Sequence, residues 1–153
     1  MKNYWLMKSE PGAYSIDDLK RDKKTYWDGV RNYQARNFMR DAMKTGDLVI
    51  FYHSNAEPSG VAGSAKVCKE GYPDFTGWDK KDKHYDSASK PEKPAWFMVD
   101  VEFMEKFKHF IPLEEIKSTT ALKTMMVARR GARLSVQPVE EKHFEIIRKL
   151  GQK

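Results

Sequence analysis

The sequence is poor in the features that mark several large classes of protein. It has one cysteine, Cys68, so no disulfide can form within the chain and a reducing compartment is expected. No apolar stretch approaches the roughly 20 residues that a membrane-spanning helix needs. The apolar run at residues 4–7 is also too short for the hydrophobic region of a signal peptide. We therefore expect a cytoplasmic protein with no membrane partner.

Motifs that mark common enzyme sites are also missing. The sequence contains no Gly-x-Ser-x-Gly, no glycine-rich phosphate-binding loop and no His-x-Glu with paired cysteines. A zinc site is not expected with one cysteine and four scattered histidines. We predict no metal, no other cofactor and no enzymatic activity. One enzymatic alternative stays open, because Lys8 and Glu10 would share one face of a strand and could form a small hydrolase site.

What the chain does contain is enough apolar sequence for a core and a modest basic excess. With 153 residues, of which 40% are hydrophobic, residues 1–153 are expected to form a single domain. Lys and Arg number 28 against 22 Asp and Glu, which gives a formal net charge of +6. Many proteins that bind no polyanion are equally basic, so this charge permits a nucleic-acid partner without selecting one.

The order of apolar patterns predicts an α+β fold. Apolar or alternating runs predict strands at residues 4–7, 48–52, 61–68, 96–103 and 133–137. Helices are predicted after a capping box at Ser15, at 33–43 after the N-cap Asn32, at 112–117, at 120–126 and from Pro138 onward. Since no regular βαβ repeat appears, we expect a small, strongly bent sheet or barrel with short helices around its rim. Residues 71–94 read as a long irregular loop, which is usually functional or flexible.

The stretch at residues 27–40 carries side chains that suit nucleic acids. Trp27 and Tyr33 offer flat faces on which an unpaired base could stack, worth on the order of 1–3 kcal/mol each. The N-terminus of the predicted helix is an anion site, because it presents free backbone N–H groups and the positive end of the helix dipole. Three guanidinium groups next to it could pair with phosphate or a base edge. They belong to Arg31, Arg36 and Arg40.

A simpler interpretation of the same stretch stays open. Trp27 could be an ordinary core residue, and the arginines could form surface ion pairs with Asp28 and Asp41. Composition alone favours this second interpretation.

Small polar side chains follow several predicted strands at the point where each strand ends. One cluster is His53-Ser54-Asn55, another is Lys8-Ser9-Glu10, and a third is Ser135-Val136-Gln137 before Pro138. Taken singly, such residues are more often turn formers, caps or a satisfied interior histidine. Taken together, convergent strand ends can build a pocket in which Ser, Asn and Gln read the edge of a base.

Five blocks of sequence, in order, resemble the signature of the EVE domain family. They are Tyr-Trp-Leu-Met-Lys-Ser-Glu-Pro at 4–11, Trp-Asp-Gly-Val-Arg-Asn-Tyr at 27–33, Tyr-His-Ser-Asn at 52–55, Tyr-Pro-Asp at 72–74 and Arg-Leu-Ser-Val-Gln-Pro at 133–138. The resemblance covers essentially the whole chain, and stand-alone bacterial members of the family are about this length. It implies a PUA-like fold, a bent mixed sheet or pseudo-barrel surrounded by short helices.

The resemblance also implies a nucleic-acid partner and a pocket for a modified base. The ligand it implies is a modified cytosine in DNA or a modified base in RNA. Carried over by position, the pocket residues are Lys8, Ser9, Trp27, Arg31, Asn32, Tyr33, His53, Ser54, Asn55, Ser135 and Gln137. Phosphate contacts are expected from Arg36 and Arg40, together with Arg31 and lysines of the 79–93 loop.

Three functions are therefore weighed. The favoured one is a monomeric reader of a modified base. The alternatives are a small hydrolase that acts on a modified nucleoside on an ASCH-like scaffold, and a protein-interaction module whose basic surface is incidental.

Overall fold

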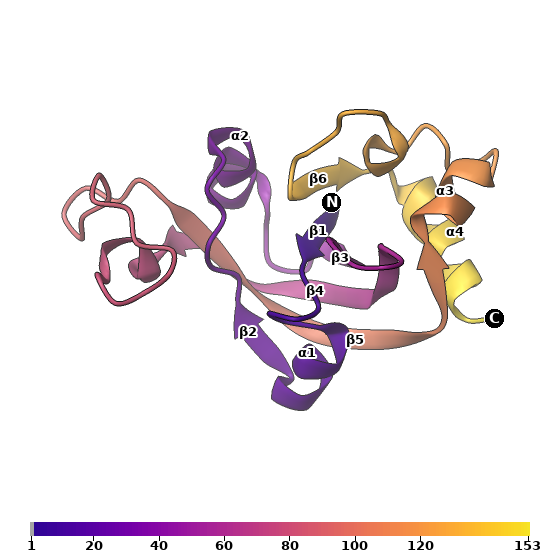
Figure 1. Ribbon diagram of the computed structural model, residues 1–153, viewed down its shortest axis with the longest axis horizontal. Coiled ribbons are helices and arrows are strands. Elements are labelled where there is room, and N and C mark those ends of the chain that lie inside the picture. Colours follow the sequence, from indigo (N-terminus) through magenta and orange to yellow (C-terminus); the bar gives the residue numbers. More distant parts are fainter. Residues whose placement is uncertain (1) are drawn as a thin grey trace.

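The protein is built on one open mixed sheet. In the computed structural model, which describes residues 2–153, the strands are β1 (Tyr4–Ser9), β2 (Lys24–Tyr26), β3 (Leu48–His53), β4 (Gly60–Pro73), β5 (Phe97–Pro112) and β6 (Val136–Val139). They lie in the order β2-β5-β4-β3-β1-β6, so β2 and β6 form the two edges (Figure 1). β1 and β3 are parallel, and each other neighbouring pair is antiparallel. The predicted α+β class is confirmed.

Alternation along the central strands gives the sheet two apolar faces. Trp5 and Met7 of β1 pack into one core cluster, whereas Leu6 between them packs into the other. β3 does the same, with Phe51 on the first face and Ile50 on the second. Successive side chains of a strand point to opposite faces, so a sheet buried on both sides needs such continuous apolar runs.

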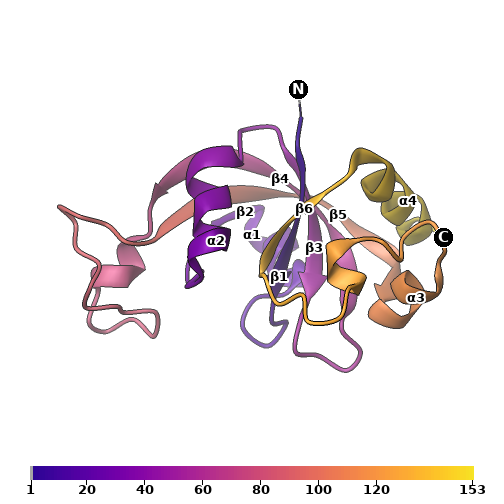
Figure 2. The same cartoon turned by 90° about the horizontal axis from the view of Figure 1, so that it is seen from above.

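Short helices cover both faces. The helix α1 (Ile16–Asp22) and the helix α2 (Tyr33–Asn37) contribute to the first core cluster, and α3 (Leu113–Ser118) and α4 (Glu141–Gly151) contribute to the second. Figure 2 shows α3 and α4 together at one end of β5 and the 74–96 loop at the other end. The capping box predicted at Ser15 is present, with Ser15 Oγ and the Asp18 carboxylate exchanging bonds with backbone N–H groups. No helix among residues 2–153 is long and apolar enough to cross a membrane.

Several predicted boundaries are wrong. The single helix expected at 33–43 is α2 followed by a π-helical turn, Phe38–Ala42. Instead of a helix at 120–126, the chain forms turns and then a short 3-10 helix, Met126–Ala128. Pro138 lies in β6 rather than opening a helix, and α4 begins at Glu141. An edge strand tolerates proline because the missing N–H need not face a neighbour.

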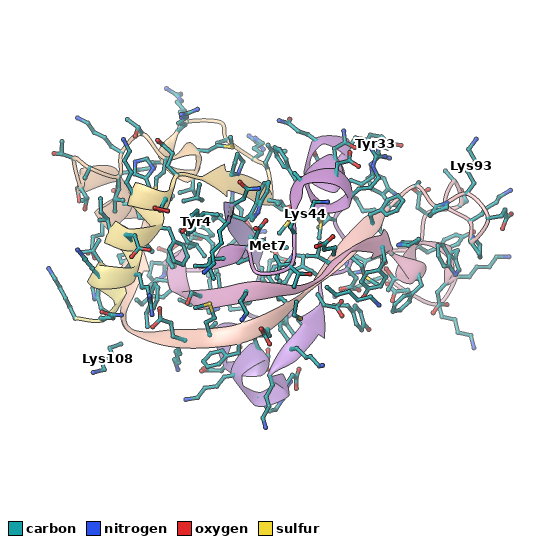
Figure 3. The ribbon with its side chains drawn as sticks, turned by 180° about the vertical axis from the view of Figure 1, so that it is seen from behind. Tyr4, Met7, Tyr33, Lys44, Lys93 and Lys108 are labelled. Carbon is teal, nitrogen blue, oxygen red and sulfur yellow. The ribbon has the colours of Figure 1, made fainter. Side chains whose placement is uncertain are left out.

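The long loop at residues 74–96 is less irregular than predicted. Residues 71–73, which were predicted as the start of the loop, belong to β4, and Phe75–Trp78 form a 3-10 helix. The loop extends away from the sheet, with Lys93 pointing outward at its far end (Figure 3). The Asp74 side chain anchors its base by accepting a hydrogen bond from the N–H of Gly29 at 2.9 Å.

Candidate functional site

A cleft of about 910 Å³ opens where β1 and β3 end. The two strands are parallel and in register, with Ser9 opposite His53, so their polar ends meet at the same edge of the sheet. Lys8 and Ser9 line the cleft from β1, and Ser54 and Asn55 line it from the turn after β3. Ser135, just before β6, completes this side. The convergence of strand ends expected from the sequence is present for these five residues.

A second wall of the cleft comes from the end of β2 and the residues after it. Tyr26 and Trp27 line this wall, and Tyr26 is 45% exposed whereas Trp27 is 8% exposed. Trp27 meets Phe51 edge to face, with ring centroids 5.4 Å apart. Trp27 is therefore a core residue that also borders the cleft, which combines the two interpretations that the sequence left open.

Lys8 near the end of β1 and Glu10 just after this strand place a cation and a carboxylate in the lining of the cleft. Lys8 is half-buried, and this burial lowers the pKa of its ammonium group. The Glu10 carboxylate accepts a 2.7 Å hydrogen bond from Nδ2 of Asn55. Asn55 has a φ of +48°, a left-handed conformation that Asn adopts more readily than most residues. The bond to Glu10 fixes which face Asn55 offers to the cleft.

The rim of the cleft is formed where the 74–96 loop meets Gly29. The ring of His84 lies against Gly29, which has a φ of +82°, and a Cβ there would be 2.5 Å from His84 Nε2. His84 Nδ1 is 3.3 Å from a carboxylate oxygen of Asp28 and 3.3 Å from one of Asp82. These three donor atoms lie within 4.8 Å of one another and could hold a divalent cation. No motif in the sequence groups these three residues, and the expectation of no metal stays a prediction.

Arg31 does not line the cleft, because its guanidinium group holds the loop in place. Its Nη1 donates to the buried carboxylate of Asp74 at 3.0 Å, and its Nη2 donates to the carbonyl oxygen of His84 at 2.7 Å. Burial alone would raise the pKa of Asp74, but hydrogen bonds from Thr76, Gly29 and Arg31 outweigh it and lower that pKa. The ion pair that the sequence suggested with Asp28 is thus made with Asp74.

Three further residues predicted for the site lie on α2, outside the lining of the cleft. Asn32 caps α2, and its Oδ1 accepts the N–H of Ala35 at 3.0 Å, so this oxygen is already engaged by the helix. Tyr33 is 60% exposed and stacks on Trp96, with centroids 4.8 Å apart. The guanidinium of Arg36 lies 4.7 Å from the Tyr33 ring centroid. Figure 3 shows Tyr33 projecting from this helix.

His53 and Gln137 also serve the backbone rather than the cleft. Nε2 of His53 accepts the N–H of Ile16 at 3.1 Å, and burial lowers the His53 pKa. Gln137 is 1% exposed and donates through Nε2 to the carbonyl oxygen of Leu134. Gln137 pairs with Leu6 in the β1–β6 ladder. It does not line the cleft and instead borders a different hollow.

Sequence reasoning missed several residues that line the cleft. Asp28 and Arg133 stand inside the signature blocks, so those blocks were the signal that could have found them. Tyr14 and Tyr26 had no such signal, because the turn before α1 and the strand β2 reach the cleft only through the fold. Burial and a hydrogen bond to Asp22 raise the pKa of Tyr14 to about 12, so its hydroxyl stays protonated at neutral pH.

Comparison with known families settles the family. The EVE domain matches residues 3–150, nearly the whole chain. The chain belongs to the EVE domain family. The PUA-like fold expected from the signature blocks is confirmed by the EVE proteins of known structure.

Relatives of this EVE domain are found in animals and bacteria. Thymocyte nuclear protein 1 from Gallus gallus is 47% identical over 163 residues, which cover 94% of this chain but 66% of that protein. Protein PSPTO5229 from Pseudomonas syringae has a crystal structure with a TM-score of 0.93 and 43% identity, covering 97% of this chain and 99% of that one. Human THYN1 protein, solved in complex with DNA that contains 5-methylcytosine, has a TM-score of 0.90 and 46% identity, with 99% of each chain covered.

Proposed function

We propose that this EVE domain binds nucleic acid and reads a modified base in the cleft at the ends of β1 and β3. The observation that carries the proposal is the polar and aromatic lining of this cleft. It occurs in a chain that is 46% identical to human THYN1, which has been solved with 5-methylcytosine-containing DNA. A volume of about 910 Å³ lies at the upper end of the usual range for ligand pockets and leaves room for a base and part of its sugar.

The polar lining supplies the groups that identify the base. Ser9, Ser54 and Ser135 offer hydroxyls that both donate and accept, and Lys8 offers a donor only. Asn55 keeps its amide oxygen for the ligand, because its Nδ2 is held by Glu10. Such a set suits the Watson–Crick edge of an unpaired or flipped base.

The aromatic side of the cleft supplies the stacking surface. Trp27 forms the inner part of this wall, and the more exposed Tyr26 forms its outer part. Trp27 stays our preferred stacking residue, since its contact with Phe51 holds the ring rigidly. A rigid ring loses little conformational freedom when a base stacks on it.

The other residues that the sequence assigned to the pocket support its shape. In this proposal Arg31 fixes the rim loop, His53 fixes the start of α1, and Asn32 fixes the start of α2. Tyr33 and Arg36 on α2 and Arg40 on the π-helical turn after it lie outside the cleft, where the exposed Tyr33 could meet a flanking nucleotide.

The preference for a methylated over an unmethylated base is limited by the free energy gained when one methyl group is buried. Burying one methyl is worth about 0.8 kcal/mol, or about a fourfold preference, unless the unmethylated base leaves an unfilled gap. A preference much greater than fourfold would therefore require a tight apolar notch in the cleft, for which the buried Trp27 is the candidate wall.

The experiment is fluorescence anisotropy with matched single- and double-stranded DNA and RNA, with and without 5-methylcytosine, at two salt concentrations. We expect preferential binding to one modified strand, reduced at high salt, with the preference lost in Trp27→Phe and Asn55→Ala. Both variants are chosen to keep the fold, which thermal melting verifies. Absence of binding to every strand at low salt would refute the proposal.

The same samples test the hydrolase alternative. If Lys8 and Glu10 formed a hydrolytic site, a modified nucleoside incubated with the protein would be converted, and Lys8→Ala would stop the conversion. We expect the nucleoside to be recovered unchanged.

A further inference from the structure

The basic excess of the chain is concentrated in one segment. Residues 116–139 contain five cationic residues and not one Asp or Glu. The rest of the chain holds 23 cations and 22 acids, so it is nearly neutral. The five cations are Lys117, Lys123, Arg129, Arg130 and Arg133.

The five cations are exposed and electrostatically unopposed. All five residues are exposed, and none forms an ion pair with any residue in the described range 2–153. Within residues 2–153, Arg129 alone among the five uses its side chain in a hydrogen bond, donating to the carbonyl oxygen of Thr124 at 3.3 Å. We call these five residues the basic track.

The basic track runs from the cleft to a second hollow. Arg133 lines the cleft, whereas Lys117, Lys123 and Arg130 line a separate open hollow of about 530 Å³. Arg130 and Arg133 are three residues apart, so their Cα atoms are at most about 11 Å apart. Arg130, which lines the hollow, therefore lies close to Arg133, which lines the cleft.

The segment that carries the basic track is fixed to the body of the protein. Leu122, Met125 and Val127 are buried in the second core cluster. A turn follows, in which the N–H of Ala132 donates to the carbonyl oxygen of Arg129 at 3.3 Å. Gly131 supplies the φ of +79° that this turn requires, so Arg130 stands at its tip. The cations are therefore presented from an ordered base rather than from a loose tail.

Resting on the proposed function, we propose that the basic track binds the phosphates of the strand that flanks the base held in the cleft. The partner is a nucleic acid rather than an acidic protein, because the track begins inside the cleft at Arg133 and continues outward without an acidic residue. Figures 1 and 2 show the connecting segment between α3 and β6 beside the ends of β1 and β3. The strand then leaves the cleft past Arg133 and Arg130 toward Lys117 and Lys123.

The test replaces Lys117, Lys123 and Arg130 by Gln and measures the salt dependence of binding. A matched control replaces three exposed lysines that line neither the cleft nor the hollow, Lys108, Lys149 and Lys153, by Gln, so that both variants lose three charges. With duplex DNA, each lost phosphate contact lowers the slope of log K against log salt by about 0.9, and by about 0.7 for a single strand. Between 50 and 200 mM salt, the wild-type affinity should fall about 40-fold more than that of the track variant on a duplex, and about 20-fold more on a single strand.

The outcomes separate this proposal from the function on which it rests. A reduced slope in the track variant alone, with the ratio of modified to unmodified binding unchanged, supports the track. If the wild type prefers the modified base but both variants keep the salt slope of the wild type, the proposal of phosphate binding by the basic track is wrong and the proposed base recognition stands. If the slope falls but no base preference exists, the track stands and the reader is wrong. Thermal melting checks that both variants are folded.

A series of oligonucleotide lengths gives an independent check. The track variant and the wild type should bind a mononucleotide equally, and their affinities should separate only when several nucleotides flank the modified base on one side. Equal affinities at every length would overturn the proposal.

Discussion

Two regions of the molecule carry clustered cations, and only one of them leaves those cations available. Around α2, Arg31 is bound to Asp74, and Arg40 is bound to Asp41 at 2.8 Å. In the basic track, no ion pair is found between the cations and any residue from 2 to 153. The first region looks more like a nucleic-acid site in the sequence, because its arginines alternate with aromatic and amide side chains.

The difference shows that a cluster of cations indicates a polyanion site only when acidic partners within the protein do not neutralise it. Asp41 is next to Arg40 in sequence, but Asp74 is 43 residues from Arg31 and reaches it only through the fold. The 79–93 loop is similar, since its five lysines are interspersed with four acids. A segment that has cations and no acids, such as 116–139, is the better indicator of a polyanion surface.

The largest effect that would test this comparison is on stability. Replacing Arg31 by Gln leaves the buried Asp74 carboxylate without its ion pair, and we expect a loss of about 3 kcal/mol in the free energy of unfolding. Arg40→Gln removes an exposed pair with Asp41 and should cost less than about 1 kcal/mol. Urea unfolding of both variants measures the difference. Equal small losses would mean that Arg31 is available to a ligand after all.

The next effect concerns the rim of the cleft. Gly29→Ala places a side chain at a φ of +82° and puts its Cβ against His84, so we expect a loss of about 2 kcal/mol together with weaker base discrimination. Gly131→Ala has a similar φ of +79° but meets no atom within 4 Å, so it isolates the backbone strain, at about 1 kcal/mol. If the two variants lost the same stability and Gly29→Ala still discriminated bases, His84 would have no part in shaping the cleft.

A smaller effect is expected from the arginines of α2 on binding. Arg36→Gln and Arg40→Gln should change the salt slope by less than the roughly 0.7–0.9 that one lost phosphate contact produces. The reason is that Arg36 donates to the carbonyl oxygen of Ala95 and Arg40 to Asp41. A full unit of slope lost in either variant would support the prediction that these residues bind phosphate.

The smallest effect is a pH dependence that arises at His53. Its folded-state pKa is lowered, chiefly by burial, so the unfolded chain takes up a proton more readily. The stabilising contribution is therefore complete above the unfolded pKa of about 6.5 and is lost as the pH falls through the folded pKa. Melting temperatures from pH 8 to pH 5 should fall more steeply for the wild type than for His53→Gln. Parallel curves would show that His53 does not titrate on unfolding.

Local signals in the sequence predicted much of the fold. The capping box at Ser15 and the cap at Asn32 were correct, because both depend on residues within one helical turn. Continuous apolar runs predicted β1 and β3, since both faces of these strands are buried, and alternating apolar residues predicted β5. β2 was missed because its three residues, Lys24–Tyr26, are mostly exposed and carry no apolar pattern.

The candidate site was harder to predict, because much of it is assembled from distant segments. The strand-end residues Lys8, Ser54 and Ser135 were found because a polar residue after an apolar strand is visible in the sequence. Tyr26 and His84 were not, since only the pairing of β2 with β5 and the packing of the loop on Gly29 bring them to the cleft. Gln137 looked equivalent to Ser135, but the register of β6 on β1 turns it into the interior.

The central claim is that the base enters the cleft beside Trp27, and an NMR titration tests it most directly. The ¹⁵N-labelled protein is titrated with a short oligonucleotide that carries one 5-methylcytosine, and the indole N–H signals of Trp27 and Trp5 are followed. Trp5 is the internal control, since its Nε1 donates to the buried Asp47 at 3.0 Å. We predict a saturable shift of the Trp27 signal, larger than with unmodified cytosine, while Trp5 stays in place. Binding that leaves Trp27 unmoved would contradict the account.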